Sequence, residues 1–587
     1  MNVKKILTSI LCFLLLTAAY ASPRRDKELV QSDSWVYDAL TSLAIQNGRV
    51  DFSDDSPLTI GQIKLLLSEY NYDSLSPSSK YYYDKIMDYI SDGSVSFESG
   101  LFSFGLEPEI NLEGYYKNNN ELSWVYDKYS RKEFLTVPAS FNIEDYLTME
   151  MDLAFTQSGG WSLHDDNYVN IPFPVNSVDV NFPRYGYLST GLDLPKDSQI
   201  NFRMGLGGQS IGRSINGSVI LSQYMTGSSW ANLEFFSPNF KFDMNVSQFN
   251  VDKYMYTHRF DLRLFKKIQF GAMESILVYA PLELRFLNPF GIYHGLTPWL
   301  DYSGKSYEEG FTCAYMCFKL AYAPCPYLRL YGLFAQDQFQ TSYELKNWPD
   351  DTTPNAMGFQ LGAESIIPLP EGQIHIWAEG YYAQPYLYIK EDPNWSLVRT
   401  YRENIGDQTI FYEWVGSPFG PDTVAGQISL GYESRTNWNV SFDYLFKAAG
   451  EYSGTKVFTD ALNWGGHDTS AAEGEWVYPD KKEQGLEEAK RRQALVTPSG
   501  IPEYLNRFAL RGSYNFNDYL SLTMQGAFVF VFNADNVSGN FQCGPEFAAS
   551  LSFDLSNLAN YLINNNKNNK SNESQSFNQE ELNENED

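Results

Sequence analysis

Basic residues are scarce in this chain. Its 587 residues include 43 Lys and Arg against 72 Asp and Glu, which gives a net charge of −29 at pH 7. A surface this negative repels phosphate backbones, so the composition excludes nucleic acid as a partner. It also argues against capture of an acidic polymer by charge alone.

Cysteine and histidine are scarce as well. Cys313 and Cys317 share one face of a predicted strand, but the strand rise separates them by about 13 Å, too far for a disulfide. The spacing of Cys313, Cys317 and Cys325 fits no zinc site, and the five His form no H-x-x-x-H pair. We therefore expect isolated thiols, no metal site and no cofactor.

Two weaker motifs are candidate sites. The segment 208–212 matches the G-x-S-x-G elbow of hydrolases, but that elbow needs a helix after it, and 215–224 is predicted as a strand. We therefore expect no catalysis. The acidic doublets Asp54-Asp55, Asp165-Asp166 and Asp350-Asp351 could ligate calcium, but chance doublets are expected among 72 carboxylates, so calcium stays open.

Long apolar runs are missing after the N-terminus. The longest, such as 526–532, are far short of the roughly 20 residues that a membrane helix needs. Residues 1–21 have the form of a secretory signal peptide: Lys4 and Lys5, an apolar run, and the small-x-small site Ala19-Tyr20-Ala21. Its removal leaves 41 basic residues against 72 acidic ones, a net charge of −31.

Aromatic residues are abundant, with 42 Tyr, 40 Phe and 12 Trp, and they follow an alternating pattern. The clearest example is 254–289, where two runs with one apolar and one polar face meet at Lys266-Lys267. A period of two over a dozen residues indicates long β-strands. Because no helical layer is interleaved to cover the apolar faces, the pattern predicts a transmembrane antiparallel β-barrel over 101–555.

Connection lengths predict the number of strands. From residue 254 onward, short connections (near 266–267, 323–326, 368–372, 434–437 and 515–518) alternate with long ones (281–308, 341–355, 385–423, 448–503 and 533–545), which gives 11 strands. Since periplasmic turns are short, the first of these 11 strands runs from the outside toward the periplasm. The first half of the chain must therefore supply an odd number of strands. We find eight candidates between 105 and 250, with 230–250 the segment most open to misassignment. Seven strands in the first half give a barrel of 18 strands, with 16 and 20 as the alternatives.

One helical segment precedes the barrel. Ser34, Thr59 and Ser76-Pro77 can each begin a short helix within 30–95. Three short helices make a thin core, so we expect a bundle that packs against the periplasmic side of the barrel. After the last strand, 556–587 is rich in Asn, Ser and Glu, which predicts a disordered tail.

Tryptophans in the long loops are the candidate binding residues. An indole ring can hold the apolar face of a sugar while polar neighbours bind its hydroxyls. The alternative for any one Trp is the membrane interface or the loop's own core. The candidates for polysaccharide binding in the two longest loops are Trp395, Trp414, Trp464 and Trp476.

A polar pair interrupts the hairpin of 254–289. With a three-residue turn at 265–267, His258 faces Glu274, and strict alternation points both at lipid. We expect a β-bulge near Met273 that turns Glu274 inward beside Arg259, because an inward guanidinium needs a carboxylate. The alternative is a pair held in place on the lipid side. Either arrangement predicts a structural role for Arg259, Glu274 and His258.

Several motifs resemble a known family. They are S-W-x-x-D-x-L-x-x-L from Ser34, G-R-V from Gly48, P-L-T from Pro57, F-P-R from Phe182, and the run His258-Arg259, Glu274 and Asn288-Pro289. Together they resemble the Wzi-type capsule assembly proteins over about residues 30–290. The resemblance implies an outer-membrane barrel with an N-terminal helical bundle, acting as a lectin for capsular polysaccharide. It assigns no individual sugar-binding residue.

These observations predict a non-catalytic protein of the cell outer membrane that binds and organises capsular or other exopolysaccharide. The expected partners are that polysaccharide, outer-membrane lipid and the barrel assembly machinery, with the chain itself a monomer. Two alternatives stay open: a diffusion porin with Glu150, Asp152, Arg259 and Arg263 along its pore, and an adhesin that uses the long loops. Which polysaccharide is bound, and whether the lumen is open, stay undetermined.

Overall fold

The computed structural model describes most of the chain. The described residues are 20–21, 23–91, 95–125, 131–157, 167–171, 178–181, 185–293, 312–349, 354–390, 394, 396–401, 411–451, 453, 485–559 and 561. Most of the predicted signal peptide (1–21) and of the predicted tail (556–587) lies outside them. Among the described residues, no helix is long and apolar enough to cross a membrane.

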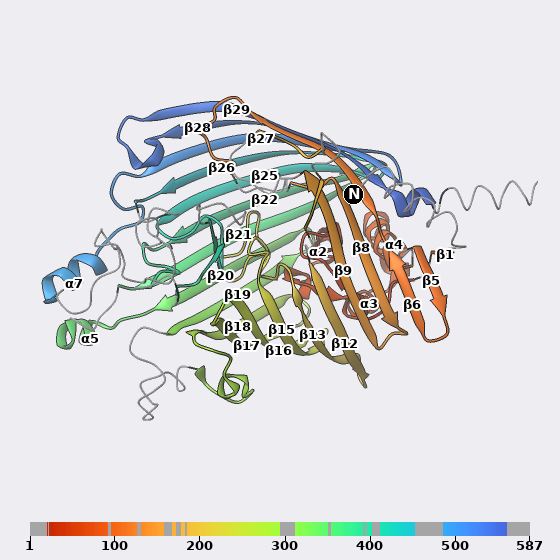
Figure 1. Cartoon of the computed structure of the whole chain (residues 1–587), viewed down its shortest axis with the longest axis horizontal. Helices are drawn as coiled ribbons and strands as arrows, with labels where there is room; N and C mark the ends of the chain where they lie inside the picture. Colours follow the sequence, from red (N-terminus) through yellow and green to blue (C-terminus); the bar gives the residue numbers. More distant parts are fainter. Residues whose placement is uncertain are drawn as a thin grey trace, which may run out of the picture.

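An antiparallel barrel of 18 strands forms the body of the protein (Figure 1). Each strand pairs with the next, and the last pairs with the first, Phe547 opposite Tyr116, which closes the barrel. The strands are β7 (Glu109–Lys117), β8 (Leu135–Ile143), β9 (Leu147–Gln157), β12 (Gly186–Leu194), β13 (Ser198–Leu206), β15 (Ser229–Ser237), β16 (Phe240–Asn250), β17 (Lys253–Leu264), β18 (Ile268–Tyr279), β19 (Thr312–Cys325), β20 (Leu328–Gln338), β21 (Ala356–Leu369), β22 (Gly372–Ala383), β25 (Thr423–Ser434), β26 (Trp438–Ala449), β27 (Glu503–Asn517), β28 (Leu520–Phe532) and β29 (Phe541–Asp554).

The predicted strand count is confirmed, with 11 strands from β17 onward and seven before it. Apart from the two-residue turn 251–252, long and short connections alternate, so the barrel has a long-loop end and a short-turn end. The segment 215–224, predicted as a strand, is not a strand of the barrel. It is a buried, irregular stretch, so its prediction as a strand was wrong, whereas 230–250 contains two paired strands.

Short elements are added at the edges of the barrel. β6 continues the line of β7 along β8 in the same register, and β5 pairs with β6. Two short helices, α5 and α7, lie in the loops of the long-loop end (Figure 1). The bounds of the elements outside the barrel wall are β1 (Tyr20–Ala21), β2 (Leu29–Val30), β3 (Asp55–Ser56), β4 (Leu58–Thr59), β5 (Val95–Ser99), β6 (Phe102–Leu106), β10 (Tyr168–Val169), β11 (Val178–Asn181), β14 (Ser210–Ile211), β23 (Val398–Tyr401), β24 (Phe411–Trp414), α5 (Ser342–Asn347) and α7 (Gly485–Gln493).

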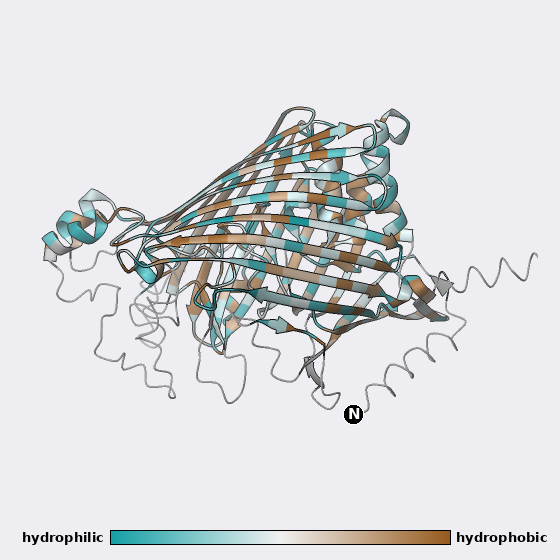
Figure 2. Ribbon diagram, turned by 90° about the horizontal axis from the view of Figure 1, so that it is seen from above, coloured by the Kyte–Doolittle hydropathy of each residue, from teal (hydrophilic) through white to brown (hydrophobic). Residues whose placement is uncertain are grey.

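The two faces of the wall differ in polarity, and Figure 2 shows apolar and polar residues alternating along the strands. Large apolar side chains are exposed on the outside, and polar side chains are buried on the inside. Outward examples are Met151, Phe202, Leu320, Leu361 and Leu510, and inward examples are Arg203, Glu234, Arg259, Lys319 and Glu364. An apolar outside around a polar inside is the pattern of a barrel whose solvent is lipid.

Three helices follow the predicted starts: α2 (Trp35–Gln46), α3 (Ile60–Ser68) and α4 (Pro77–Ser91). The Ser34 side chain accepts a hydrogen bond from Val36 N at the first turn of α2. Thr59 and Gln62 form a reciprocal capping box on α3, which satisfies two backbone donors that the helix itself cannot. The local signals therefore fixed these helix starts correctly.

The helical bundle lies inside the short-turn end of the barrel (Figure 1). The apolar core of the bundle includes Phe236 of the barrel wall. The ring of Phe236 lies 5.8 Å from the ring of Phe52 in the bundle. Just after α2, Gly48 has a φ of +63°, and a Cβ there would lie 2.9 Å from Pro326 N in a short turn. Glycine thus permits both the turn and the close approach of the bundle to the wall.

Candidate functional site

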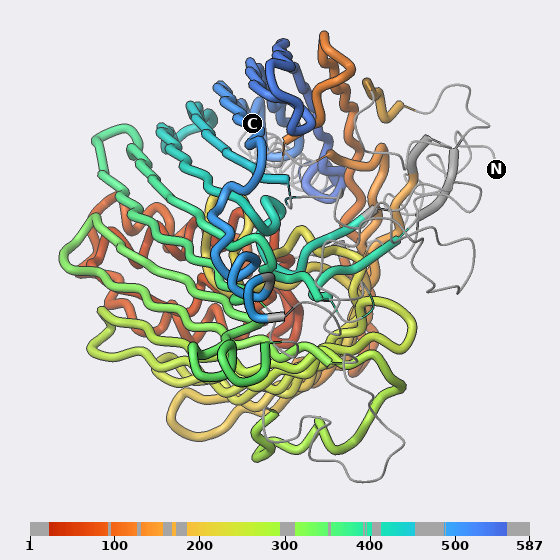
Figure 3. The backbone as a smooth tube through the Cα atoms, turned by 90° about the vertical axis from the view of Figure 1, so that its left-hand side faces the viewer, coloured from red at the N-terminus to blue at the C-terminus, as the bar shows by residue number. Residues whose placement is uncertain are grey.

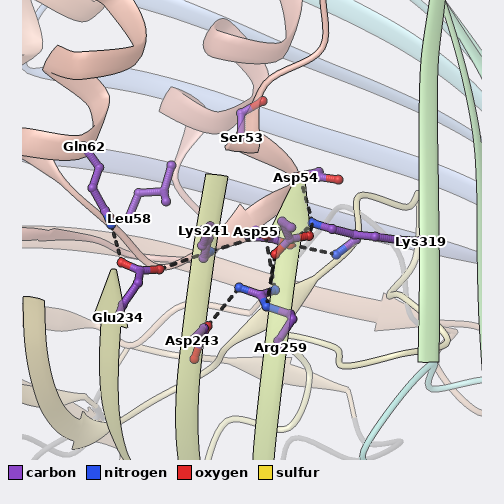
Figure 4. A network of polar contacts seen from close by, with 12 residues as sticks. Ser53, Asp54, Asp55, Leu58, Gln62, Glu234, Lys241, Asp243, Arg259 and Lys319 are labelled. Carbon is purple, nitrogen blue, oxygen red and sulfur yellow. Dashed lines mark hydrogen bonds and ion pairs between the residues drawn. The ribbon is translucent and has the colours of Figure 1, made fainter. Parts of the chain in front are cut away.

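The bundle is bound to the barrel wall through a buried network of charges around Asp55. Lys241, Arg259 and Lys319 come from three different strands and lie 3.3, 3.2 and 2.7 Å from the Asp55 carboxylate (Figure 4). Lys319 also lies 3.3 Å from Asp54. All five side chains are nearly inaccessible to solvent.

Wall carboxylates balance the remaining cationic charge. Glu234 is 3.2 Å from Lys241, Asp243 is 2.9 Å from Arg259, and Asp261 is 3.0 Å from Lys319. On the neighbouring strand, a Cβ at Gly271 would lie 2.4 Å from an Asp261 carboxylate oxygen. Because glycine has no side chain, position 271 leaves room for the Asp261 carboxylate in the network.

The two carboxyl groups of the doublet differ in their electrostatics. Burial alone would raise the pKa of Asp55, but the charges of Arg259, Lys319 and Lys241 outweigh burial and hold its pKa below the ordinary value. At Asp54, burial and the neighbouring Asp55 charge outweigh Lys319 and raise the pKa. Asp55 is therefore the fixed negative charge of the network.

Further polar contacts extend the attachment around the bundle. Their donors and acceptors come from both the helices and the wall, so no single strand holds the bundle. They are Arg203 Nη1 to Pro57 O (2.8 Å), Arg263 Nη2 to Glu69 (2.6 Å), Gln269 Nε2 to Asp54 Oδ1 (2.8 Å), Gln46 Nε2 to Gln373 Oε1 (2.8 Å), Tyr82 Oη to Glu433 Oε2 (2.6 Å) and Tyr327 N to Ile45 O (2.8 Å).

A loop from the long-loop end of the barrel also reaches the bundle at Asp55. The connection 207–228 joins β13 to β15 at the long-loop end, yet its β14 pairs with β3 of the bundle, Ser210 opposite Ser56 and Ile211 opposite Asp55. Ser218, Val219 and Ile220 of this loop are buried. We call 207–228 the inner loop. Its pairing connects the long-loop end to the bundle through the inside of the barrel.

A second loop packs on the inner loop. Within 384–422, Tyr388 donates a hydrogen bond to Val219 O at 2.6 Å, and Val415 O accepts one from Ser222 N at 3.0 Å. Tyr315 of the wall also donates to Val219 O, at 2.8 Å. In Figure 3, seen from the long-loop end, loop segments and the helices behind them occupy the inside of the ring of strands. The lumen is therefore obstructed at two levels, by the bundle and by these loops.

A cavity of about 220 Å³ lies at the long-loop end beside this obstruction. Its lining comes from three connections and the adjoining strand ends. Buried apolar side chains form its inner part, and polar side chains, several of them exposed, form the rest. The lining residues are Glu121, Leu122, Ser123, Trp124, Val125, Pro418, Phe419, Lys447, Glu503, Leu505, Val529, Val531, Ala534, Asp535 and Gln542.

Together with Phe419, Trp124 supplies the aromatic part of the cavity lining. Its ring meets Tyr115 edge-on at 5.4 Å, and the Arg131 guanidinium lies 5.5 Å from the Trp124 ring centroid. Such contacts hold an indole in one orientation. Elsewhere on the lining, Lys447 Nζ lies 3.9 Å from Glu503 Oε1. The sequence alone does not reveal this site, because its parts are separated by more than 400 residues.

The predicted tryptophan site is only partly within the described residues. Trp395, Trp464 and Trp476 lie outside them. Trp414 is described and is 7% exposed: it stacks on Tyr388, with ring centroids 6.0 Å apart, in the loop core that obstructs the lumen. Trp414 therefore presents no open ring face at the surface. It belongs to the core of the loop, which was the alternative to a role in sugar binding.

The hairpin around His258 has the predicted register, but the predicted bulge is wrong. His258 pairs with Glu274 and Leu264 with Ile268, without a register shift between β17 and β18. Tyr293, from the following loop, stacks on the His258 ring with centroids 4.3 Å apart. The loop thereby covers the pair on the outer face, so no bulge is needed to remove it from lipid.

Arg259 does point inward and is paired with carboxylates, as charge balance requires, but Glu274 is not among them. Its partners are Asp55, Asp243 and Asp261. Asp55 could not be recognised as a partner from the sequence, because it lies 204 residues away in a different element. The doublet Asp54-Asp55 is likewise engaged by Lys and Arg, and no cluster of metal-binding side chains occurs among the residues that the structure describes.

Comparison with known proteins gives a clear result for the fold. No protein-family model and no curated protein matches the sequence. Among solved structures, the chain is similar to Wzi of Escherichia coli, described as an outer-membrane protein involved in group 1 capsule assembly and a carbohydrate-binding β-barrel. The TM-score is 0.54 at 11% identity, and the match covers 90% of this chain and 99% of that one.

Two other outer-membrane proteins match more weakly. OccAB4 of Acinetobacter baumannii has a TM-score of 0.35 at 10% identity, over 78% of this chain and 98% of that one. An anion-selective porin from Comamonas acidovorans has a TM-score of 0.32 at 8% identity, over 77% and 100%. The similarity to Wzi confirms the fold expected from the motifs. The chain is an outer-membrane β-barrel of 18 strands with N-terminal helices, and the predicted location in the cell outer membrane is confirmed.

Proposed function

We propose that this protein is a non-catalytic surface lectin that binds capsular or other exopolysaccharide at its long-loop end and holds it against the outer membrane. The observation that carries the proposal is the combination of an obstructed lumen with a cavity at the long-loop end. The cavity offers the Trp124 ring beside carboxylate, ammonium and amide groups, which is the chemistry that sugars require.

The obstructed lumen argues against the alternative of a diffusion porin. The side chains expected along a pore are engaged in protein contacts. Glu150 accepts hydrogen bonds from Tyr185 and Tyr187 at 2.8 and 2.6 Å, Asp152 accepts one from Val137 N at 3.1 Å, and Arg263 is paired with Glu69. A porin needs such groups to face water in an open channel.

The orientation follows from the proposal and from the connection lengths. Short turns are periplasmic in bacterial barrels, so the bundle of 30–95 faces the periplasm and the cavity faces the outside. Residues 1–21 act as the signal peptide, and 556–587 form a polar tail. The further partners are outer-membrane lipid on the apolar wall and the barrel assembly machinery, with the chain acting as a monomer.

Three measurements test the proposal. In a planar bilayer, the purified chain should show no large steady conductance, because the bundle and the inner loop obstruct the lumen. Purified chain should bind the exopolysaccharide of its own cells on a glycan array, and cells lacking the chain should release that layer. Steady large openings would support the porin instead. Binding to matrix protein without binding to any glycan would support the adhesin.

A further inference from the structure

We infer that the cavity between the long loops holds a single uncharged sugar residue that carries a methyl group, such as a 6-deoxy or N-acetyl sugar at a branch or end of the polymer. This inference rests on the proposed lectin function and names the chemistry of its ligand. It is carried by three properties of the cavity: its size, its apolar inner wall and its charge.

The size of the cavity fits one ring. At about 220 Å³ it is smaller than the roughly 300–1,000 Å³ of pockets that enclose drug-sized ligands. A cavity of this size suits a single sugar residue, whereas a stretch of several residues does not fit. The rest of the polymer must therefore lie outside, which makes the bound residue a branch or an end.

The inner wall of the cavity is aliphatic. Leu505, Val529, Val531 and Ala534 are each at most 5% exposed and belong to the apolar core that fills the lumen. A bare hydroxyl placed against this surface would lose its hydrogen bonds to water without replacement. A methyl group placed there gains contacts instead, worth about 0.8 kcal/mol per buried carbon. The wall therefore favours a sugar that directs a methyl inward.

The charge of the lining opposes acidic sugars. Glu121, Glu503 and Asp535 contribute three carboxylates, and Lys447 contributes the one ammonium group of the lining. That ammonium lies 3.9 Å from Glu503, so its charge is already matched. A uronate in the cavity would be repelled by the net charge of −2 on the lining. The net charge of −29 on the whole chain adds to this repulsion. The hydroxyls of an uncharged sugar can instead donate to Glu503 and Gln542, with the ring against Trp124.

The test uses the full chain in detergent and four probes: methyl rhamnoside, N-acetylglucosamine, glucose and glucuronate. In saturation-transfer NMR, the methyl protons of the first two probes should receive the strongest saturation, and glucuronate should show none. The variant Val531→Thr puts a hydroxyl on the inner wall and should weaken binding of both methyl-bearing probes about tenfold. The same exchange at the buried wall residue Val278 is the matched control and should leave binding unchanged.

The charge is tested separately. The double variant Glu503→Gln and Asp535→Asn removes two carboxylates and should make glucuronate binding detectable. The inference is overturned if saturation is uniform over the sugar ring, if glucuronate binds the wild type as well as rhamnoside does, or if Val531→Thr has no effect. If the native polysaccharide still binds in those cases, the lectin function stands and only the assignment of its ligand fails. If no glycan binds at all, both fail.

Discussion

The Nζ of Lys319 lies 2.7 Å from Oδ1 of Asp55, although the two residues are 264 positions apart in the chain. The contact joins the barrel wall to the helical bundle at the point where the inner loop also reaches the bundle. One carboxylate thus faces three cations of the wall and pairs through its backbone with a loop from the opposite end. We therefore regard Asp55 as the residue on which closure of the lumen most depends.

Asp55→Asn should detach the bundle from the wall. The change leaves Lys241, Arg259 and Lys319 without their shared anion, and removing one partner of a buried ion pair typically costs about 3–5 kcal/mol. We expect larger conductance in a planar bilayer and faster proteolysis within the bundle, with the barrel still folded.

Asp54→Asn is the matched control at the neighbouring position. The pKa of Asp54 is raised by burial and by the Asp55 charge, so its ionised form is already disfavoured. An Asn there can still accept the hydrogen bond that Gln269 Nε2 donates at 2.8 Å. Conductance should stay near that of the wild type. Equal effects at both positions would contradict the central role of Asp55.

Attachment of the bundle should be insensitive to pH between about pH 5 and 8. A carboxyl whose pKa is lowered on folding stabilises the folded state fully above its unfolded pKa of about 3.9. That stabilisation is lost only as the pH falls through the lower, folded value, and the pKa of Asp55 is lowered. Protease resistance of the bundle, measured along a pH series, should weaken only in stronger acid. Release between pH 6 and 8 would show that another group controls the attachment.

Trp414→Ala should act on stability rather than on a surface sugar contact. Trp414 is 7% exposed and stacks on Tyr388 inside the obstructing loops. Truncating a buried Trp costs about 3–5 kcal/mol, so the loops should loosen and conductance should rise. Trp414→Phe keeps most of the packing and should bind polysaccharide normally. Loss of polysaccharide binding in Trp414→Phe, with unchanged conductance, would place Trp414 in the binding site instead.

Deletion of 454–484 tests the part of the predicted sugar site that lies outside the described residues. This segment contains Trp464 and Trp476 but none of the residues that line the cavity. If the cavity is the main site, purified chain without 454–484 should still bind polysaccharide. Complete loss of binding in a folded barrel would show that these two tryptophans carry the function. The loop 384–422 is unsuitable for such a deletion, because it also obstructs the lumen.

Glu274→Gln should lower the stability of the barrel more than its binding of polysaccharide. Glu274 pairs across the hairpin with His258, and Tyr293 covers His258 at a ring distance of 4.3 Å. Loss of the charge weakens the pair that this loop covers, far from the cavity residues in the sequence. The transition from folded to heat-denatured barrel on a gel should shift to lower temperature. Normal assembly with lost binding would reveal a functional role.

The sequence by itself determined the features that depend on near neighbours. The alternation along 254–289 fixed which side chains face outward, and the short turn at 265–267 fixed the pairing of His258 with Glu274. Ser34 and Thr59 fixed two helix starts through hydrogen bonds within three residues. Connection lengths gave the strand count, because a strand must return across the membrane before the next begins.

Only the tertiary structure decided what fills the barrel. The segment 215–224 has an apolar pattern that fits a strand, but it lies in the inner loop, because a closed lumen offers another apolar environment besides lipid. The sequence shows that Arg259 needs a carboxylate partner but does not show which one. Only the fold brings Asp55 within 3.2 Å of Arg259. Charge attraction and burial depend on distance in space, which the order of residues along the chain does not fix. For the same reason the cavity around Trp124 and Val531, whose walls come from distant loops, could be found only after the chain had folded.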